Sequence, residues 1–387
     1  MNILVVLPRF PYPLEKGDKL RAYHQLRVLS QFHTLYLVTL NEVSLSTVDI
    51  AHVQRYCKEI HVIQLTPFSK LIHLVRCFFS GLPLQCGYFY KNEARRTILD
   101  IVERIKPDRI YCQLIRVAEY VKDIPIPKTL DYQDVLSKGM QRRAEQAPFY
   151  KKPLFNFEYK RLLRYEEKIF SSFDHKVIIT EVDRDLIPHI ENETIHIIAN
   201  GVDFEQYKYQ DGEKKYDLLF AGNMNYPPNI EAAEYLAKQV FPILQKEFPD
   251  LTLVICGTNP TSKVKALQNK HIIVTGWVES MAEYYAKSRI FIAPMHLGTG
   301  LQNKLLEAMS MKLPCITSTL AGNPLRGIES EKEIIICNTT TGYVEMVKFL
   351  LQNPEKRAEI GENGYQFVKR NYNWETINEQ LAKIITS

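Results

Sequence analysis

The most informative stretch of this sequence is Gly298-Thr299-Gly300-Leu301-Gln302-Asn303-Lys304-Leu305-Leu306-Glu307-Ala308-Met309. It follows the short apolar run 289–294, which is typical of a buried parallel strand, and its glycines permit a tight turn into a helix expected over 301–311. The free backbone N–H groups and the positive dipole end of such a helix favour an anion. The pattern therefore predicts a phosphate-binding turn.

Two charged residues of this predicted helix carry the chemistry. Lys304 falls in the first turn, and Glu307 lies three residues further along. Because residues three apart share a helical face, a cation for phosphate and an acceptor for a pair of hydroxyl groups would point the same way. This arrangement suits a nucleoside diphosphate. The alternative is an i,i+3 surface ion pair that binds nothing, since short motifs also occur by chance.

Strands alternate with helices along the whole chain. We expect strands at 3–7, 34–39, 61–64, 109–112, 128–131, 176–180, 217–221, 252–256, 272–275, 290–293, 315–318 and 334–337. Such alternation predicts doubly wound parallel sheets, and two sets of strands predict two Rossmann-like domains. The domains are expected over residues 1–190 and 191–371.

Composition agrees with a two-domain globular protein. The chain has 387 residues, of which 45% are hydrophobic and 24% are charged. No run reaches the roughly 18 apolar residues of a membrane-spanning helix. Seven cysteines without CxxC spacing indicate reduced thiols and no zinc site. We expect a cytoplasmic protein, acting there or at the inner face of the cell membrane, and a net charge of +5 does not by itself indicate nucleic acid.

Further motifs stand in order around the first stretch. They are Ala199-Asn200-Gly201-Val202-Asp203, the run 220–229, Thr275-Gly276-Trp277-Val278, Tyr284-Tyr285-Ala286 and the continuation 310–318. Together with the opening stretch they resemble the C-terminal half of glycosyltransferase family 4, retaining enzymes of the GT-B fold. The N-terminal half resembles the family more weakly, and most closely the subgroup that acts in bacterial exopolysaccharide and capsule assembly.

The resemblance implies a fold and a division of labour. It implies an α/β protein with two Rossmann-like doubly wound domains facing each other across a cleft. Residues 1–190 would bind the acceptor, 191–371 would bind the nucleotide-sugar, and a last helix over 372–387 would cross back to the N-terminal domain. The implied donor-binding residues are Gly17, Arg21, Gly222, Asn223, Trp277, Val278, Gly298, Thr299, Gly300, Leu301, Lys304 and Glu307.

Two positions depart from the family's pattern. Many members carry a second glutamate eight positions before Glu307, where this chain has Thr299. A basic residue often found in the first loop of the C-terminal domain is replaced by Asn223 and its neighbours. More of the diphosphate binding would then rest on Lys304, or on Arg21 or Arg116 from the other domain.

The implied reaction transfers a sugar from a nucleoside-diphosphate sugar to a hydroxyl of a lipid-linked or saccharide acceptor with retention. The family uses both uridine and guanosine donors, and we favour a UDP-sugar over a GDP-sugar. Lys304 and the helix amides would stabilise the departing diphosphate. The loops after 112 and 131 are the expected source of N-terminal catalytic groups. The candidates there are Gln113, Arg116, Asp131 and Asp134, of which we favour Arg116 and Asp134. Asp131 alternatively ends a strand.

The N-terminal glycine loop and one acidic pair complete the candidates. Gly17 matches the family's glycine loop, and Asp18 is expected as the N-cap of the helix that follows. For His24 we favour a packed or solvated helix face. Asp183-Arg184-Asp185 has the spacing of a metal-binding carboxylate pair, but we favour a helix start there. No metal and no other cofactor is expected.

Two basic and aromatic segments suggest peripheral membrane association. The segments 68–96 and 149–165 mix lysine and arginine with large apolar residues, as helices at a membrane interface do. Packing on the N-terminal sheet or a solvated helix face explains them equally well. No nucleic-acid partner is expected.

Two other functions remain open. The nucleotide-sugar 2-epimerases share the GT-B fold, and such an isomerase would need no acceptor. A nucleotide-binding partner without catalysis is the third hypothesis, because Thr299 stands where many members have a glutamate.

Overall fold

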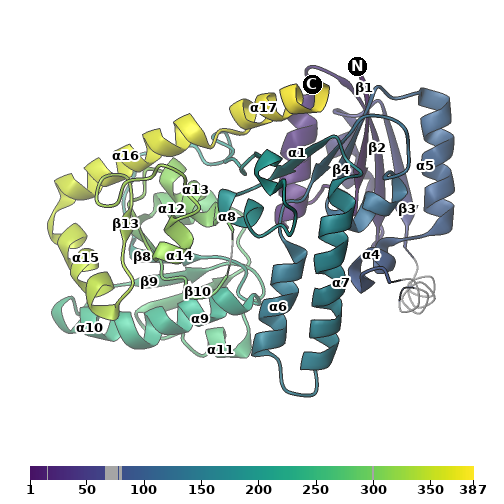
Figure 1. Cartoon of the computed structure of the whole chain (residues 1–387). Coiled ribbons are helices and arrows are strands. Elements are labelled where there is room, and N and C mark those ends of the chain that lie inside the picture. Colours follow the sequence, from purple (N-terminus) through teal and green to yellow (C-terminus); the bar gives the residue numbers. More distant parts are fainter. Residues whose placement is uncertain (15, 66–76, 78–80, 299) are drawn as a thin grey trace. The chain divides into compact units, whose positions relative to one another are not determined.

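A computed structural model describes residues 1–14, 16–65, 77, 81–298 and 300–387 (Figure 1). The chain forms two compact units: unit 1 is Met1–Ala199 with Trp374–Ser387, and unit 2 is Asn200–Asn373. The first unit thus extends to Ala199 and not to residue 190, and the last segment returns to it from Trp374 onward. Each unit has a parallel sheet with helices on both sides, which confirms the predicted α/β class with two Rossmann-like domains.

The sheet of unit 1 has the strand order β3-β2-β1-β4-β5-β6-β7. Its strands are β1 (Asn2–Leu7), β2 (Thr34–Asn41), β3 (Glu59–Gln64), β4 (Arg109–Gln113), β5 (Lys128–Asp131), β6 (His175–Ile178) and β7 (His196–Ile197). Its helices are α1 (Gly17–Leu29), α2 (Thr47–Gln54), α4 (Leu84–Phe89), α5 (Asn92–Ile105), η1 (Ile115–Tyr120), α6 (Leu136–Gln146), α7 (Lys152–Phe170), α8 (Glu181–Arg184), η2 (Asn192–Thr194) and α17 (Trp374–Thr386). The central strands are buried on both faces, as the apolar run of β1 predicts.

The last helix, α17, packs against α1 at the other end of the sequence. Its residues Ile377, Leu381 and Ile385 belong to the same buried cluster as Ile3 and Val5 of β1. Amphipathic spacing explains this, because the three residues recur every four positions and share one helical face. The C-terminal segment therefore completes the core of unit 1.

Unit 2 repeats the architecture with the strand order β10-β9-β8-β11-β12-β13. Its strands are β8 (Tyr216–Ala221), β9 (Leu253–Cys256), β10 (Ile272–Gly276), β11 (Ser288–Ala293), β12 (Cys315–Thr317) and β13 (Ile335–Ile336). Its helices are α9 (Pro227–Tyr235), η3 (Leu236–Val240), α10 (Phe241–Glu247), α11 (Ser262–Lys265), α12 (Met281–Ala286), α13 (Asn303–Ser310), α14 (Thr319–Gly322), α15 (Thr340–Gln352) and α16 (Pro354–Asn371).

The first and last residues of unit 2 are close in space. Val202 forms an isolated parallel bridge with Asn373. The backbone N–H of Val202 donates to the carbonyl of Tyr372 at 2.8 Å. The predicted Asn200–Asp203 signature therefore lies where the chain passes from one unit to the other.

Two glycines let the loops after β8 and β9 touch. The backbone N–H of Gly222 donates to the carbonyl of Cys256 at 3.0 Å. A Cβ at Gly257, whose φ is +143°, would lie 1.8 Å from the carbonyl oxygen of Gly222. Only glycine permits this approach, so Gly257 fixes the path of the loop that follows β8.

The segment 68–96 is only partly within the described residues, since 66–76 and 78–80 lie outside them. In its described part, Phe89 is buried, and Leu82, Tyr88 and Tyr90 pack against the core of unit 1. For these residues packing on the N-terminal domain, and not a membrane face, is the correct reading. In the part of the chain that is described, no helix combines the length and apolarity needed to cross a bilayer.

Candidate functional site

The site predicted in unit 2 lies where the direction of strand addition reverses. β8 and β11 are neighbours, and the chain leaves them for opposite sides of the sheet. In doubly wound sheets, ligands bind at such a switch point, outside the carboxyl ends of the strands. The loop from β8 to α9 carries Gly222 and Asn223, and the loop from β11 to α13 carries Gly298, Gly300 and Leu301.

Lys304 of α13 has its ammonium group among neutral partners. Its Nζ donates to Oδ1 of Asn229 at 2.6 Å, lies 3.7 Å from the sulfur of Met295, and stands 4.9 Å from the ring centre of Phe220. Within the described residues no carboxylate lies at ion-pair distance from it. Burial lowers the pKa of Lys304 to about 7, and the charge of Glu307 opposes this shift. Such a cation lacks a counter-ion, which a bound phosphate would supply.

Glu307 is held separately, by two tyrosines. Its Oε2 accepts the hydroxyl of Tyr285 at 2.9 Å, and Tyr207 donates a second hydrogen bond. Burial raises the pKa of Glu307, while these hydroxyls and the charge of Lys304 lower it. The two side chains therefore do not form the i,i+3 surface pair that was the alternative reading. Tyr285 belongs to α12, so Glu307 is tied to the helix that follows the Trp277 loop.

Asn229 connects the lysine with the loop after β8. Its side chain is buried, and while Oδ1 accepts from Lys304, Nδ2 donates to the carbonyl of Asn223 at 3.0 Å. A Cβ on Gly222 would lie 2.6 Å from the same Nδ2, so the loop packs directly on this amide. Asn229 thus positions both Lys304 and the Gly222–Asn223 loop.

The glycine turn before α13 has the backbone geometry that its sequence requires. Gly298 and Gly300 have φ values of +117° and +68°, which residues with a side chain rarely adopt. The helix begins at Asn303, two residues later than expected, so Leu301 precedes it. Oδ1 of Asn303 accepts from the amide of Asn200 at 3.2 Å, which anchors the helix start. Thr299 lies outside the described residues.

The predicted base loop follows β10. Gly276 ends this strand with φ +70°, Trp277 is 68% exposed, and Val278 is half-buried. A depression of about 590 Å³ adjoins the loop. It is lined by Pro260, Lys265, Gln268, Val274, Thr275 and Gly276. An exposed indole beside a depression can stack on a flat aromatic ring, as a nucleobase requires.

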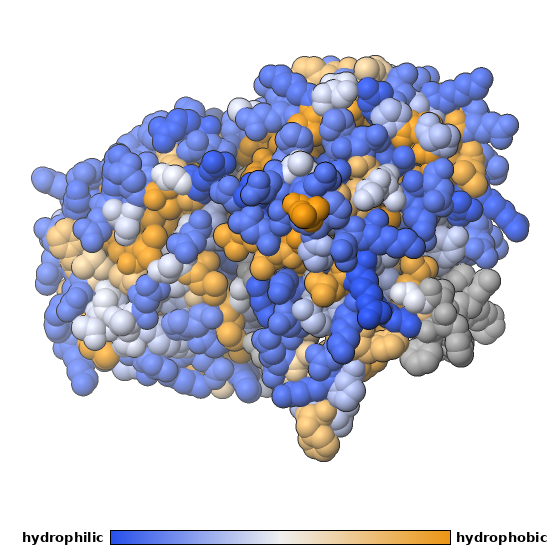
Figure 2. Space-filling view, in the orientation of Figure 1, coloured by the Kyte–Doolittle hydropathy of each residue, from blue (hydrophilic) through white to orange (hydrophobic). Residues whose placement is uncertain are grey.

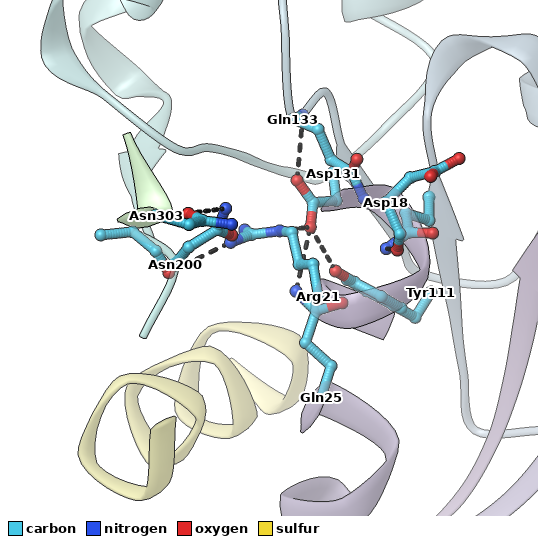
Figure 3. A network of polar contacts seen from close by, with 10 residues as sticks. Asp18, Arg21, Gln25, Tyr111, Asp131, Gln133, Asn200 and Asn303 are labelled. Atoms are coloured by element: carbon cyan, nitrogen blue, oxygen red, sulfur yellow. Dashed lines mark hydrogen bonds and ion pairs between the residues drawn. The ribbon is translucent and has the colours of Figure 1, made fainter. Parts of the chain in front are cut away.

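In unit 1, Arg21 lies in a buried network and is not presented to solvent (Figure 3). Its Nε donates to Oδ2 of Asp131 at 2.7 Å, and its Nη1 donates to the carbonyl of Ala199 at 3.1 Å. The same carboxylate oxygen accepts from the hydroxyl of Tyr111 at 2.6 Å and from the amide of Gln25 at 3.0 Å. Both charges are thus satisfied inside unit 1, which gives Arg21 and Asp131 a positioning role between α1 and the sheet.

The loops at the β1–β4 switch point of unit 1 hold the other predicted residues. The guanidinium of Arg116 donates to Oε1 of Gln85 from Nη2 at 2.8 Å and lies 5.7 Å from the ring centre of Phe89. Arg9 stands 5.5 Å from the same ring. Burial lowers the pKa of Arg116, and the charge of Arg9 adds to this effect, while Asp134 opposes it. Two cations therefore share one aromatic ring at this edge of the sheet.

Asp134 keeps accessible surface, and its Oδ1 accepts the backbone N–H of Val135 at 2.8 Å. Desolvation by the protein around the carboxylate raises the pKa of Asp134, and the Val135 amide and the charges of Arg142 and Arg116 oppose this shift. Arg116 and Asp134 thus interact through their charges. The amide of Gln113 donates to the carbonyl of Asp18 at 3.3 Å.

The prediction that Asp18 is the N-cap of α1 is wrong. The helix begins at Gly17 with Lys16 at the cap position, and Asp18 sits in the first turn. Its carboxylate pairs with Arg9 at 2.5 Å. A carboxylate is favourable anywhere in the first turn, so the sequence could not distinguish the two positions. His24 is buried and stacks on Trp374 at 4.9 Å between ring centres.

The carboxylates of Asp183 and Asp185 have different partners. Asp183 is buried, lies in the first turn of α8 and accepts the hydroxyl of the N-cap Thr180 at 2.5 Å. Asp185 pairs with Arg184 at 2.9 Å. Burial raises the pKa of Asp183 to about 6, and its contacts with Thr180 place it at the start of α8. Among the residues described, no cluster of three or more histidine, cysteine or acidic side chains could hold a metal ion.

Comparisons with solved structures agree with the fold. The chain aligns with the crystal structure of Anabaena Alr3699/HepE in complex with UDP and glucose, with a TM-score of 0.71, 13% identity and 99% of each chain covered. It aligns with WaaG, a glycosyltransferase involved in lipopolysaccharide biosynthesis, with a TM-score of 0.67, 15% identity and 100% of each chain covered. Two Rossmann-like domains of this kind define the GT-B fold.

Sequence comparison narrows the class. Residues 215–353 match the model of the family described as glycosyl transferases group 1. The matched range lies within unit 2 and includes Gly222, Asn229, Lys304 and Glu307. Over its full length the chain is 25% identical to an uncharacterized 44.6 kDa protein in the cps region of Klebsiella pneumoniae, with 99% of each sequence covered.

Sequence reasoning missed the residues that hold the two charged side chains. Asn229, Tyr207 and Tyr285 all contact Lys304 or Glu307, but none was predicted as a site residue. Asn229 follows Pro227-Pro228 in the first turn of α9, the helix after the first strand of its domain. A polar residue in that position is a usable signal. The tyrosines gave no comparable signal, because aromatic residues at helical spacing usually fill a core.

Proposed function

We propose that this protein is a retaining glycosyltransferase that moves a sugar from a nucleoside-diphosphate sugar to an acceptor hydroxyl. The proposal rests on the contacts of two side chains of α13, Lys304 and Glu307. Lys304 is a cation with neutral contacts, and Glu307 is a carboxylate held by two tyrosines, one helical turn away at a switch point. A diphosphate calls for a cation, and the hydroxyl groups of a ribose call for an acceptor such as a carboxylate.

The chemistry assigned to the chain's own residues is leaving-group stabilisation. In the transition state the sugar carries positive charge and the diphosphate gains negative charge. Lys304 and the N-terminal amides of α13 lie where they can stabilise that negative charge, and a half-buried setting strengthens the interaction. No protein nucleophile is required, since an oxygen of the departing phosphate can accept the proton of the acceptor hydroxyl. Arg116 and Asp134 are the proposed N-terminal contributors.

For the donor we propose a UDP-sugar in preference to a GDP-sugar, without a bound metal ion. Two observations support this choice. A structure with the same fold is described as a complex with UDP and glucose. The described residues also leave the diphosphate to a lysine and backbone amides, and these need no metal to neutralise it. The acceptor is proposed to be a lipid-linked or other saccharide in bacterial polysaccharide or glycolipid assembly, as the cps-region relative suggests.

Thermal unfolding of the purified chain with UDP, GDP, ADP and CDP, each with and without magnesium, tests the donor assignment. A ligand at about 100 times its dissociation constant adds about 2.7 kcal/mol to the free energy of unfolding. We expect a selective shift with UDP that does not depend on magnesium. A shift with GDP alone would contradict the choice of base, and no shift with any diphosphate would contradict the site.

Two variants test the roles at α13. Glu307→Ala should weaken UDP binding about 10- to 100-fold, because a hydrogen bond to a charged group contributes about 1.5–3 kcal/mol. Lys304→Ala should reduce turnover more than ground-state binding. The matched controls are Glu283→Ala and Lys287→Ala, which remove an exposed ion pair of α12. Equal losses in site and control variants would reject the assignment.

Product analysis separates the proposed reaction from its alternatives. Proton NMR of the product reports the anomeric configuration, and the retained configuration is expected. Conversion of the donor sugar to its 2-epimer without acceptor would identify an isomerase. Stabilisation by UDP without any turnover of a panel of UDP-sugars would identify a nucleotide-binding partner.

A further inference from the structure

Helices α6 and α7 of unit 1 form a hairpin whose end projects from the sheet (Figure 1). We call residues 147–154 the hairpin tip. Phe149 is 85% exposed, Tyr150 is 65% exposed and Leu154 is 57% exposed. Apolar atoms are visible at the end of the hairpin in Figure 2, at the bottom of the view. Three large side chains without cover at one projecting point need an explanation, whereas scattered ones do not.

The tip is an ordered turn that presents its rings. The backbone N–H of Lys151 donates to the carbonyl of Pro148 at 2.9 Å. The rings of Phe149 and Tyr150 pack edge to face with centres 5.7 Å apart, and the Lys151 ammonium lies 5.7 Å from the Tyr150 ring centre. The two rings contact each other and a lysine, and both remain exposed to solvent.

The exposed charge around the hairpin tip is mainly positive. The exposed cations between residues 141 and 165 are Arg143, Lys151, Lys152, Lys160 and Arg164. The acids in that range are Glu145 and Glu158. Glu158 is buried, and its carboxylate accepts the backbone N–H groups of Leu84 and Gln85 at 2.7 and 2.9 Å. Its charge is therefore used to cap α4, and Glu145 alone offsets the exposed cations.

We propose that the hairpin tip docks on a membrane surface that carries anionic phospholipid, with Phe149 and Tyr150 in the interface and the lysines at the headgroups. Aromatic rings prefer the boundary between headgroups and acyl chains, and each nearby basic residue adds attraction to an anionic leaflet. A convex tip with a few rings suits a fluid surface, whereas a protein partner would require an extended complementary face. The inference goes beyond the proposed transfer reaction, because it rests on unit 1 alone.

Co-sedimentation with vesicles tests the docking surface. We expect the full chain to bind vesicles that contain phosphatidylglycerol and to bind pure phosphatidylcholine weakly. Phe149→Ser/Tyr150→Ser and Lys151→Glu/Lys152→Glu should each lower the partition coefficient about tenfold or more. Ile190→Ser, at a side chain that is 97% exposed in the same unit, and Lys369→Glu/Arg370→Glu, with the same change of net charge, are the matched controls.

A fluorescence experiment tests insertion directly. In Phe149→Trp, the new indole should shift its emission to shorter wavelength when anionic vesicles are added, while Ile190→Trp should show no shift. The two natural tryptophans, Trp277 and Trp374, contribute the same background to both variants.

The outcomes separate this inference from the proposed function. Stabilisation by UDP should be unchanged in every hairpin variant, because none of its residues belongs to the nucleotide site. Absence of vesicle binding by the parent chain, or equal losses in hairpin and control variants, would overturn the docking proposal without touching the transferase proposal. Vesicle binding that needs the lysines but shows no emission shift in Phe149→Trp would reject insertion of the rings and would overturn the proposal as stated.

Discussion

At the scale of single residues, the site depends on a lysine that gives up part of its usual basicity. Lys304 has Asn229, Met295 and Phe220 as its neighbours, all of them neutral. Burial therefore lowers its pKa to about 7. A diphosphate placed beside it would raise that pKa again, so ligand binding and proton binding are coupled.

This coupling predicts a pH dependence of nucleotide affinity. Well below pH 7, Lys304 is protonated in both the free and the bound protein, so its contribution to the affinity is constant. As the pH rises above 7, the free protein loses the proton while the complex keeps it, so affinity for UDP falls by up to about tenfold per pH unit. Calorimetric titration in buffers of different ionisation enthalpy should show proton uptake at pH 8.

Lys304→Gln is the control for that titration. Its affinity should be lower than that of the parent and nearly flat between pH 7 and 9. A parent profile that is also flat would show that Lys304 does not titrate on binding.

Asn229 permits a second prediction. Its amide is neutral, so it leaves the charge of Lys304 available for an anionic ligand. Asn229→Asp would place a carboxylate at the same position, 2.6 Å from Nζ in the present geometry. The new ion pair should lower UDP affinity about tenfold or more, since a charge-assisted bond must be given up and a like charge faces the ligand. Asn225→Asp, an exposed position in the same loop, is the control. Equal effects of both changes would point to general repulsion.

At the scale of elements, two contacts fix loops to sheets. The first is the ion pair between Arg21 and Asp131, which ties α1 to the end of β5. Both side chains are fully buried, so removing one partner leaves a charge without compensation. The second is the approach of the Gly222 and Gly257 loops.

Arg21→Met should therefore lower the free energy of unfolding of unit 1 by about 3–5 kcal/mol. The double variant Arg21→Met/Asp131→Asn should recover part of this loss, because no buried charge remains. Denaturant unfolding followed by Trp374 fluorescence measures both, in a Trp277→Phe background that silences unit 2.

The matched control for the buried pair is Arg27→Met. Arg27, also in α1, pairs with Glu375 of α17 at 2.6 Å, but both side chains reach solvent. Its removal should cost about 1 kcal/mol or less. Similar losses at Arg21 and Arg27 would contradict the role of burial.

Gly257→Ala should lower the stability of unit 2 by about 2–4 kcal/mol, because a new methyl group meets the Gly222 carbonyl and the backbone φ is unfavourable. UDP affinity should fall as well, since the Gly222 loop must move. Gly212→Ala, which would meet no atom within 4 Å, should change stability by less than about 0.5 kcal/mol. Circular dichroism during denaturant unfolding measures both, and equal stability of the two variants would contradict the close approach.

At the scale of the whole molecule, the sequence predicts the two-domain architecture but not all of the residues that hold Lys304 and Glu307 in place. Apolar runs between turn residues placed the strands at their observed positions, because buried parallel strands leave a strong local signal. The two-residue strand β7 was missed, since it is too short to show a pattern. Lys304 and Glu307 were predictable from helical spacing. Asn229 carried a usable signal in its position after two prolines at a helix start. Tyr207 and Tyr285 did not, because their contacts with Glu307 join elements distant in sequence.

The core of unit 1 joins both ends of the sequence, which gives a prediction for the last helix. Leu381 of α17 is fully buried in the cluster that contains β1 and α1. Leu381→Ala should destabilise unit 1 by about 2–5 kcal/mol, through lost burial and the cavity left behind. Glu379→Ala, on the exposed side of the same helix, is the control. Unfolding followed by Trp374 fluorescence would contradict the prediction if both variants matched the parent.

The bridge between Val202 and Asn373 has a consequence for how such enzymes diversify. Because unit 2 begins and finishes at adjacent points, residues 200–373 form an insert that can be exchanged as one block without stretching the host chain. Recombination at these two junctions would transplant the proposed nucleotide-binding module and leave the rest of unit 1 intact. Under the two proposals made above, donor preference and membrane docking would then be encoded by separate genetic segments.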